Sequence, residues 1–191
     1  MALTPSTMLP LGTRLPAFRL SDLDGREVSS DDFKTAPGLV VAFICPHCPY
    51  VKHMRQELGA FAKEYRDRGL AIVGINSNDT SSNPDDGPAG MQQEVVAAGY
   101  TFPYLLDKTQ AVAKAFRAAC TPDLFLFDRT GSLVYRGQFD DSRPGNARPV
   151  TGADLRAAAD AVLAGGPLPT DQKSSIGCNI KWKPGNEPDY V

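Results

Sequence analysis

The feature that most constrains this chain is a Cys-x-x-Cys pair, Cys45 and Cys48, placed directly after a six-residue apolar run. The run, 39–44, is rich in β-branched residues, and its length and composition predict a strand buried on both faces. A second run of the same kind covers 70–75. The spacing of the large apolar residues between the two runs predicts one helix; these residues are Met54, Leu58, Phe61 and Tyr65. Strand, helix and strand in this order predict a βαβ unit with parallel strands.

The rest of the chain predicts a mixed sheet with helices on both faces. We expect an N-terminal β-hairpin over 17–28, helices over 90–98, 109–119 and 151–165, a strand over 102–106, and an antiparallel hairpin over 123–137. Four prolines after position 165 predict an irregular C-terminal extension over 166–191. The fold class is therefore α/β, in a single domain over 1–191.

Composition excludes several classes of partner and of location. The formal net charge is -2, so the chain has no large positive field to hold nucleic acid or an anionic membrane. No apolar run approaches the length of a bilayer span, and the first residues lack the pattern of a secretory signal. We therefore expect a cytoplasmic protein, in a compartment where stable structural disulfides are rare.

The position of the cysteine pair predicts redox chemistry. Cys45 follows a buried strand, Pro46 suits the first position of a helix, and Cys48 would then lie in the first turn. Free backbone N–H groups and the helix dipole favour a thiolate there, and a protonated His47 would favour it further. In this interpretation Cys45 attacks a disulfide as the nucleophile and Cys48 is its partner.

Two other interpretations of the pair compete with redox chemistry. The two cysteines could be inert core residues, although Pro46 and His47 make a poor core strand. A metal site could also form from Cys45, Cys48 and His53, with His47 or Cys178 as a fourth ligand. Redox chemistry is favoured because the chain holds no second pair of ligands with matching spacing.

Several motifs resemble the peroxiredoxin-like branch of the thioredoxin superfamily, also called AhpC/TSA or redoxin, and in particular one bacterial subfamily with a Cys-x-x-Cys site. The matching segments are Phe43-Ile44-Cys45-Pro46-His47-Cys48-Pro49-Tyr50, Ile75-Asn76-Ser77-Asn78-Asp79, Cys120-Thr121-Pro122-Asp123 and Ser175-Ile176-Gly177-Cys178. The resemblance implies a thioredoxin-like fold in which Pro122 is a cis-proline facing the redox pair. It also implies that Thr121 offers its backbone to a substrate disulfide.

The same resemblance supplies an alternative activity, a thiol-dependent peroxidase with an antioxidant role. Peroxiredoxins carry Pro-x-x-x-Thr-x-x-Cys around the cysteine that attacks peroxide. Aligned on Cys48, this chain has Val41 and Cys45 in place of the Pro and the Thr. This departure favours dithiol–disulfide exchange. In a peroxidase, Cys48 would form a sulfenic acid and Cys45 would resolve it.

The other two cysteines are candidates for additional redox roles. Cys120 precedes Pro122 by two residues, and Cys178 lies in the tail, where it could resolve a disulfide, in its own chain or in a partner subunit. Packing in the interior is the alternative for both. We expect no cofactor. The expected partners are protein or small-molecule thiols and disulfides, with a thioredoxin-type electron donor. A homodimer is the commonest assembly for such a chain.

Overall fold

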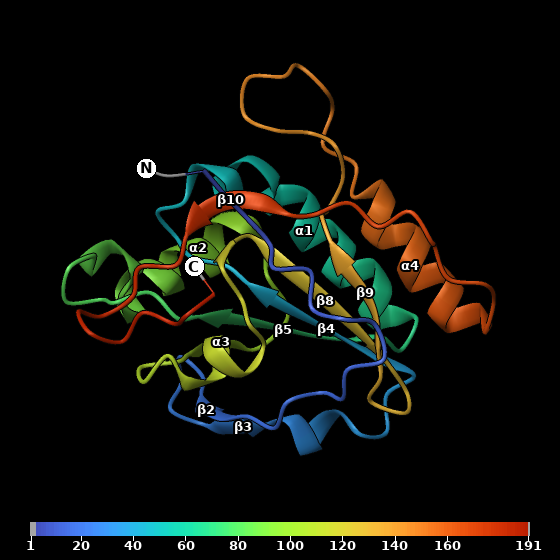
Figure 1. The fold of residues 1–191 in the computed structure, drawn as a ribbon, viewed down its shortest axis with the longest axis horizontal. Helices are drawn as coiled ribbons and strands as arrows, with labels where there is room; N and C mark the ends of the chain where they lie inside the picture. Colours follow the sequence, from blue (N-terminus) through green and yellow to red (C-terminus); the bar gives the residue numbers. More distant parts are fainter. Residues whose placement is uncertain (1–2, 191) are drawn as a thin grey trace.

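The chain folds into a mixed α/β arrangement, which a computed structural model describes for residues 3–190 (Figure 1). The elements in chain order are β1 (Leu3–Pro5), β2 (Arg19–Ser21), β3 (Glu27–Ser29), η1 (Ser30–Phe33), β4 (Gly38–Phe43), α1 (Pro49–Asp67), β5 (Ala71–Asn76), η2 (Pro84–Asp86), α2 (Pro88–Ala98), β6 (Tyr104–Leu106), α3 (Ala111–Ala115), β7 (Cys120–Thr121), β8 (Asp123–Asp128), β9 (Leu133–Gly137), α4 (Ala153–Ala164) and β10 (Ile176–Asn179). The η elements are single 3₁₀ turns.

The central sheet has seven strands in the order β3-β2-β6-β5-β4-β8-β9. Strands β4, β5 and β6 are parallel, so the predicted βαβ unit is confirmed. Strand β8 runs antiparallel to β4 and forms a hairpin with β9. The N-terminal hairpin of β2 and β3 joins the sheet through β6. The expectation of a mixed sheet is confirmed.

The two faces of the sheet carry separate apolar cores. Successive residues of β4 point to opposite faces, so Val40 and Ala42 enter one core and Val41 and Phe43 the other. Helices α1, α2 and α4 cover the first face, and α3 and the β2–β3 hairpin cover the second (Figure 1). The cysteine pair belongs to the first core.

The structure differs from the expected elements at the end of α3 and in the C-terminal tail, among other places. Helix α3 ends at Ala115 and not at 119, because Arg117 adopts a left-handed conformation with φ of 49°. The tail, expected to be irregular over 166–191, contains one strand, β10. This strand lies between β1 and β7 in a second, three-stranded sheet. Residue 191 lies outside the described residues.

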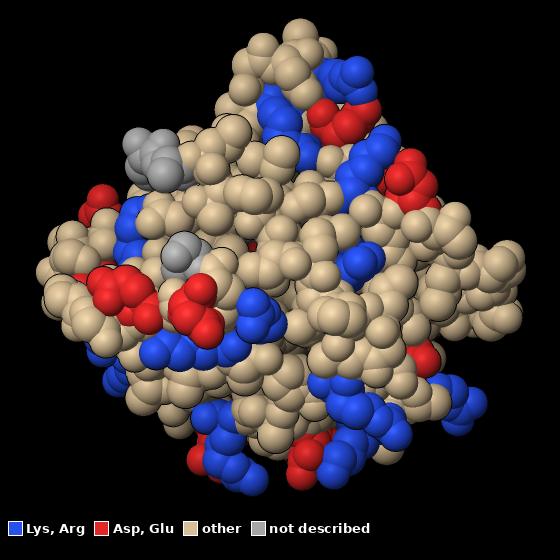
Figure 2. Space-filling view, viewed as in Figure 1, with Lys and Arg blue, Asp and Glu red and all other residues tan. Residues whose placement is uncertain are grey.

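Charged side chains of both signs are scattered over the face seen in Figure 2, and the surface over β10 shows none. This distribution agrees with the small net charge of the chain. Within residues 3–190, none of the helices combines the length and the apolarity that crossing a bilayer requires.

Candidate redox site

The cysteine pair lies where the chain leaves β4 and enters α1. Both Cys45 and Cys48 are fully buried, and all four cysteines of the chain are free thiols. Cys48 is the N-cap of α1 and Pro49 is its first residue. The sequence had predicted the helix to start three residues earlier, with Cys45 at the cap and Pro46 as its first residue, and this prediction is wrong. The backbone N–H of His47 donates to Asp86 Oδ1 at 3.0 Å, which holds 46–47 as a turn ahead of the helix.

Thr121 and Pro122 face this turn, as the resemblance implied. The Thr121–Pro122 peptide bond is cis. The Thr121 hydroxyl lies 3.4 Å from the sulfur of Cys45, and the sulfur of Cys48 lies 3.1 Å from the Thr121 carbonyl oxygen, to which it donates when it is protonated. One residue of β7 therefore contacts both sulfurs of the pair.

The two thiols differ strongly in acidity. The pKa of Cys48 falls from 9.0 to about 5, chiefly because the Cys45 thiol donates a hydrogen bond to it. The Thr121 hydroxyl and the backbone N–H of Val51, in the first turn of α1, also favour the thiolate against the opposing effect of burial. The same hydrogen bond, together with burial, raises the pKa of Cys45. The sequence pattern predicts Cys45 as the nucleophile, whereas in the structure Cys48 is the N-cap of α1 and accepts the hydrogen bond of the Cys45 thiol.

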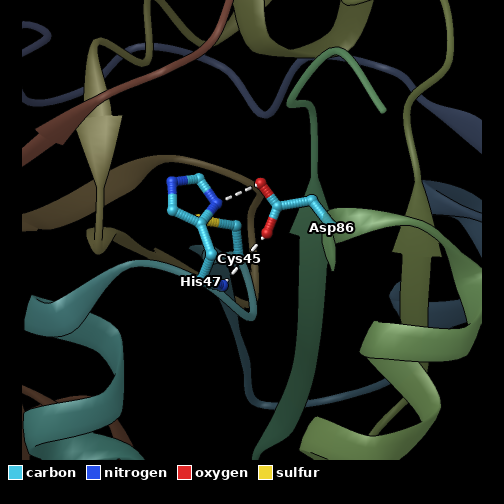
Figure 3. A group of neighbouring side chains, drawn as sticks. All are labelled: Cys45, His47 and Asp86. Atoms are coloured by element: carbon cyan, nitrogen blue, oxygen red, sulfur yellow. Dashed lines mark hydrogen bonds and ion pairs between the residues drawn. The ribbon is translucent and has the colours of Figure 1, made fainter. Parts of the chain in front are cut away.

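His47 connects the pair to a buried carboxylate that the sequence analysis did not assign to the site (Figure 3). Its Nδ1 pairs with Asp86 Oδ2 and lies 4.0 Å from the sulfur of Cys45. Asp86 is fully buried, and its carboxylate also accepts a hydrogen bond from the side chain of Asn78 at 2.8 Å.

Asp86 is contributed by η2, inside the polar segment 76–88. The polar composition of 76–88 is typical of a loop. No spacing within the sequence links position 86 to position 47. The resemblance to the family includes Asn78, and this residue is the only sequence signal that this polar segment contributes to the site.

Among the described residues, the structure does not bring together the candidate metal ligands suggested by the sequence, because His53 has a different partner. Nε2 of His53 bonds to the hydroxyl of Ser142 at 2.8 Å. Within the described residues, the His, Cys and acidic side chains close enough to share an ion are Cys45, His47 and Asp86. In this group the Asp86 carboxylate already accepts hydrogen bonds from His47 and Asn78.

The third and fourth cysteines lie on neighbouring strands beside the pair. Cys120 and Thr121 form β7, and β10 pairs with this strand so that Cys178 lies opposite Thr121. Burial raises the pKa of the Cys120 thiol, and burial together with Cys48 raises that of Cys178 to about 12. The resemblance implied that the Thr121 backbone is open to a substrate. The structure corrects this implication, because β10 already pairs with that edge.

The fold and the site together define a thioredoxin-like oxidoreductase. The chain belongs to the Redoxin family, whose model matches residues 10–155. This confirms the resemblance to the peroxiredoxin-like branch of the superfamily.

The relatives with assigned names are distant in sequence. A solved structure, in contrast, is similar over nearly the full length of the chain. Thiol-disulfide oxidoreductase ResA from Geobacillus thermodenitrificans is 25% identical over 130 residues, which cover 68% of this chain and 70% of that protein. The chloroplastic peroxiredoxin Q of Suaeda salsa is 27% identical over 143 residues, which cover 69% of this chain and 62% of that protein. The names of these relatives indicate an oxidoreductase.

Among solved structures, an uncharacterized conserved protein from Geobacillus kaustophilus is 52% identical, with a TM-score of 0.94 over 97% of this chain and 98% of that one. The thioredoxin domain of a thiol-disulfide oxidoreductase from Bacteroides vulgatus is 22% identical, with a TM-score of 0.57 over 67% of this chain and 88% of that one. The second similarity confirms the thioredoxin-like fold.

Proposed function

We propose that this protein is a thiol–disulfide oxidoreductase that cycles Cys45 and Cys48 between dithiol and disulfide. The observation that carries the proposal is the geometry of the pair: both sulfurs lie at the junction of β4 and α1 and contact Thr121, and the hydrogen bond of the Cys45 thiol lowers the pKa of Cys48. A thiolate is the form that attacks a disulfide, and a neighbouring thiol is what resolves the mixed disulfide.

In the proposed reaction, the two cysteines supply both electrons that reduce the substrate disulfide. The Cys48 thiolate attacks one sulfur of the substrate disulfide, and the other substrate sulfur leaves as a thiolate. Cys45 then gives up its proton and attacks the Cys48 sulfur, which releases the second substrate thiol. The protein loses two electrons and the one proton of Cys45, and the substrate disulfide becomes one thiol and one thiolate, which takes its proton from solvent. A dithiol donor then reduces the Cys45–Cys48 disulfide of the protein back to its starting form.

His47 is the side chain of the site that reaches solvent. It is 19% exposed, and it lines a cleft of about 500 Å³ together with Lys52, Asp85 and Glu94. We propose that a thiol or disulfide substrate approaches along this side, because β10 covers the edge of β7. A thioredoxin-type donor and a cytoplasmic location remain proposals that rest on the sequence.

Loss of Cys48 should abolish turnover, and loss of Cys45 should slow it strongly. Exchange between dithiothreitol and a labelled peptide disulfide, followed by fluorescence, measures this directly. We expect Cys48→Ser to fall to the uncatalysed rate, Cys45→Ser to fall well below the rate of the unmodified protein, and Cys120→Ser, which changes a buried thiol outside the pair, to keep the rate of the unmodified protein. Exchange that persists in both variants of the pair would disprove the proposal.

A second function, reduction of peroxide, is favoured by one specific observation. The acidic sulfur is Cys48, which is the residue that aligns with the peroxide-attacking cysteine of peroxiredoxins. Its thiolate would take one peroxide oxygen to form a sulfenic acid, and Cys45 would condense with that acid to release water. Measuring peroxide consumption in the presence of a saturating dithiol tests this function. The absence of consumption would exclude a peroxidase activity.

A further inference from the structure

The tail strand β10 occupies the edge of the redox site. It pairs with β1 on one side and with β7 on the other, so this part of the C-terminal tail is fixed by two ladders. Figure 1 shows β10 beside β1, and β10 also contacts α1. The strand therefore lies between the N-terminal strand and the residues that face Cys45 and Cys48.

The register of β10 places one cysteine against the pair. Cys178 lies directly opposite Thr121, and opposed residues of an antiparallel ladder project from the same face, with Cβ atoms about 5 Å apart. Thr121 uses that face to bring its hydroxyl to the sulfur of Cys45. Cys178 is 3% exposed and belongs to the same apolar core as Cys45 and Cys48.

Cys120 provides an internal comparison on the same ladder. It is the neighbour of Thr121 along β7, so its side chain points to the opposite face. Its sulfur lies 3.5 Å from the carbonyl oxygen of Pro122, to which it donates. Two equally buried cysteines of one small sheet therefore differ in the direction of their thiols, and only Cys178 faces the pair.

Gly177 keeps β10 close to the site. A Cβ atom at this position would lie 2.0 Å from the Thr121 carbonyl oxygen and 3.2 Å from the ring of Pro122. Only glycine permits this approach, and the neighbouring Cys178 is held at a fixed position as a result.

We propose that Cys178 is the third redox thiol of the site and that a Cys48–Cys178 disulfide alternates with the Cys45–Cys48 disulfide. The inference rests on the proposed function, which supplies the Cys45–Cys48 disulfide. The Cys178 thiol loses its proton and attacks the Cys48 sulfur, the Cys45–Cys48 bond breaks, and Cys45 leaves and takes up the proton. The number of electrons in the protein does not change, so the step needs no further oxidant.

The acidity of the three sulfurs agrees with this arrangement. The Cys178 thiol contributes to lowering the pKa of Cys48, and Cys48 in turn contributes to raising the pKa of Cys178. Cys48 is thus the central sulfur, with a protonated thiol on each side.

Trypsin separates the cysteines into three peptides, so disulfide mapping tests the proposal. Residues 35–52 carry Cys45 and Cys48, residues 118–129 carry Cys120, and residues 174–181 carry Cys178. The full-length protein is oxidised with diamide at low micromolar concentration, its free thiols are blocked with N-ethylmaleimide, and the digest is analysed by mass spectrometry without reduction. Fragmentation of a cross-linked pair shows whether Cys45 or Cys48 is bonded.

We expect the unmodified protein to give both the disulfide within 35–52 and a cross-link from Cys48 to 174–181. Cys45→Ser should increase the cross-linked fraction at least fivefold, while Cys48→Ser and Cys178→Ser should remove it. The matched control, Cys120→Ser, should leave it unchanged.

Three outcomes would overturn the inference. These are no cross-link in the Cys45→Ser variant, a cross-link through Cys120, or a cross-link found only in a disulfide-bonded dimer on a non-reducing gel. Failure of the proposed function looks different, because the disulfide within 35–52 would itself be absent from the oxidised protein.

Discussion

At the scale of single residues, the hydrogen bonds around Cys48 favour its thiolate. Cys48 has three kinds of donor around it, namely the Cys45 and Cys178 thiols, the Thr121 hydroxyl and a backbone N–H at the start of α1. Because its pKa is lowered from 9.0 to about 5, the thiolate stabilises the reduced protein, and this stabilisation is lost as the pH falls through about 5. A stabilised reduced form makes the disulfide a better oxidant.

The reduction potential of the pair should therefore show an unusual dependence on pH. Between about pH 5 and 9, reduction takes up only one proton for two electrons, because Cys48 stays ionised and Cys45 is protonated. We expect a slope of roughly 30 mV per pH unit in this range and roughly 59 mV below it. Equilibration with a glutathione or dithiothreitol redox buffer at several pH values measures the slope. A slope of roughly 59 mV throughout would show that Cys48 is protonated.

At the scale of elements, β10 is the segment on which access to the site depends. Gly177 lies against the Thr121 carbonyl, and a methyl group there has no space. Gly166, in the same tail, has no other atom within 4 Å of the position its Cβ would take and has no left-handed backbone. The two glycines are therefore a matched pair for the same substitution.

Gly177→Ala should displace β10 from β7. We expect an unfolding free energy lower by about 1–3 kcal/mol, the usual cost of overpacking, and at least tenfold faster tryptic cleavage after Lys173. Gly166→Ala should leave both quantities close to those of the unmodified protein. Limited proteolysis and denaturant unfolding, both under reducing conditions, give the two measurements. Equal cleavage rates in the two variants would contradict the close packing of β10.

At the scale of the whole molecule, one buried acid links global stability to pH. Asp123 begins β8 and is fully buried, and among the described residues its Oδ1 has no hydrogen-bond partner. Burial raises its pKa from 3.8 to about 7. The folded state thus binds a proton that the unfolded chain releases between these two values, so this residue lowers the stability as the pH rises from about 4 to about 7.

Asp123→Asn should remove this dependence, since the amide cannot ionise. We expect the variant to gain stability relative to the unmodified protein as the pH rises, by up to about 4 kcal/mol between pH 4 and pH 8. Denaturant unfolding of both proteins across that range, under reducing conditions, measures the difference. A constant difference between the two proteins at all pH values would refute the assignment.

The sequence by itself determined the order of the main strands and helices of the central sheet and the location of the cysteine pair. These features are local: alternation or continuity of apolar residues specifies strands and helices, and Cys45 and Cys48 are three residues apart at their junction. The cis bond before Pro122 came from resemblance, since nothing local distinguishes that proline from others.

Only the tertiary structure decided which cysteine caps α1, which carboxylate joins His47, and where Cys178 lies. Pro46 and Pro49 are both compatible with a helix start, and the choice between them depends on Asp86, 39 residues beyond His47. The pairing of Cys178 with Thr121 joins positions 57 residues apart through a strand of four residues. Such contacts depend on how distant segments pack, and the spacing of residues along the chain carries no record of that packing.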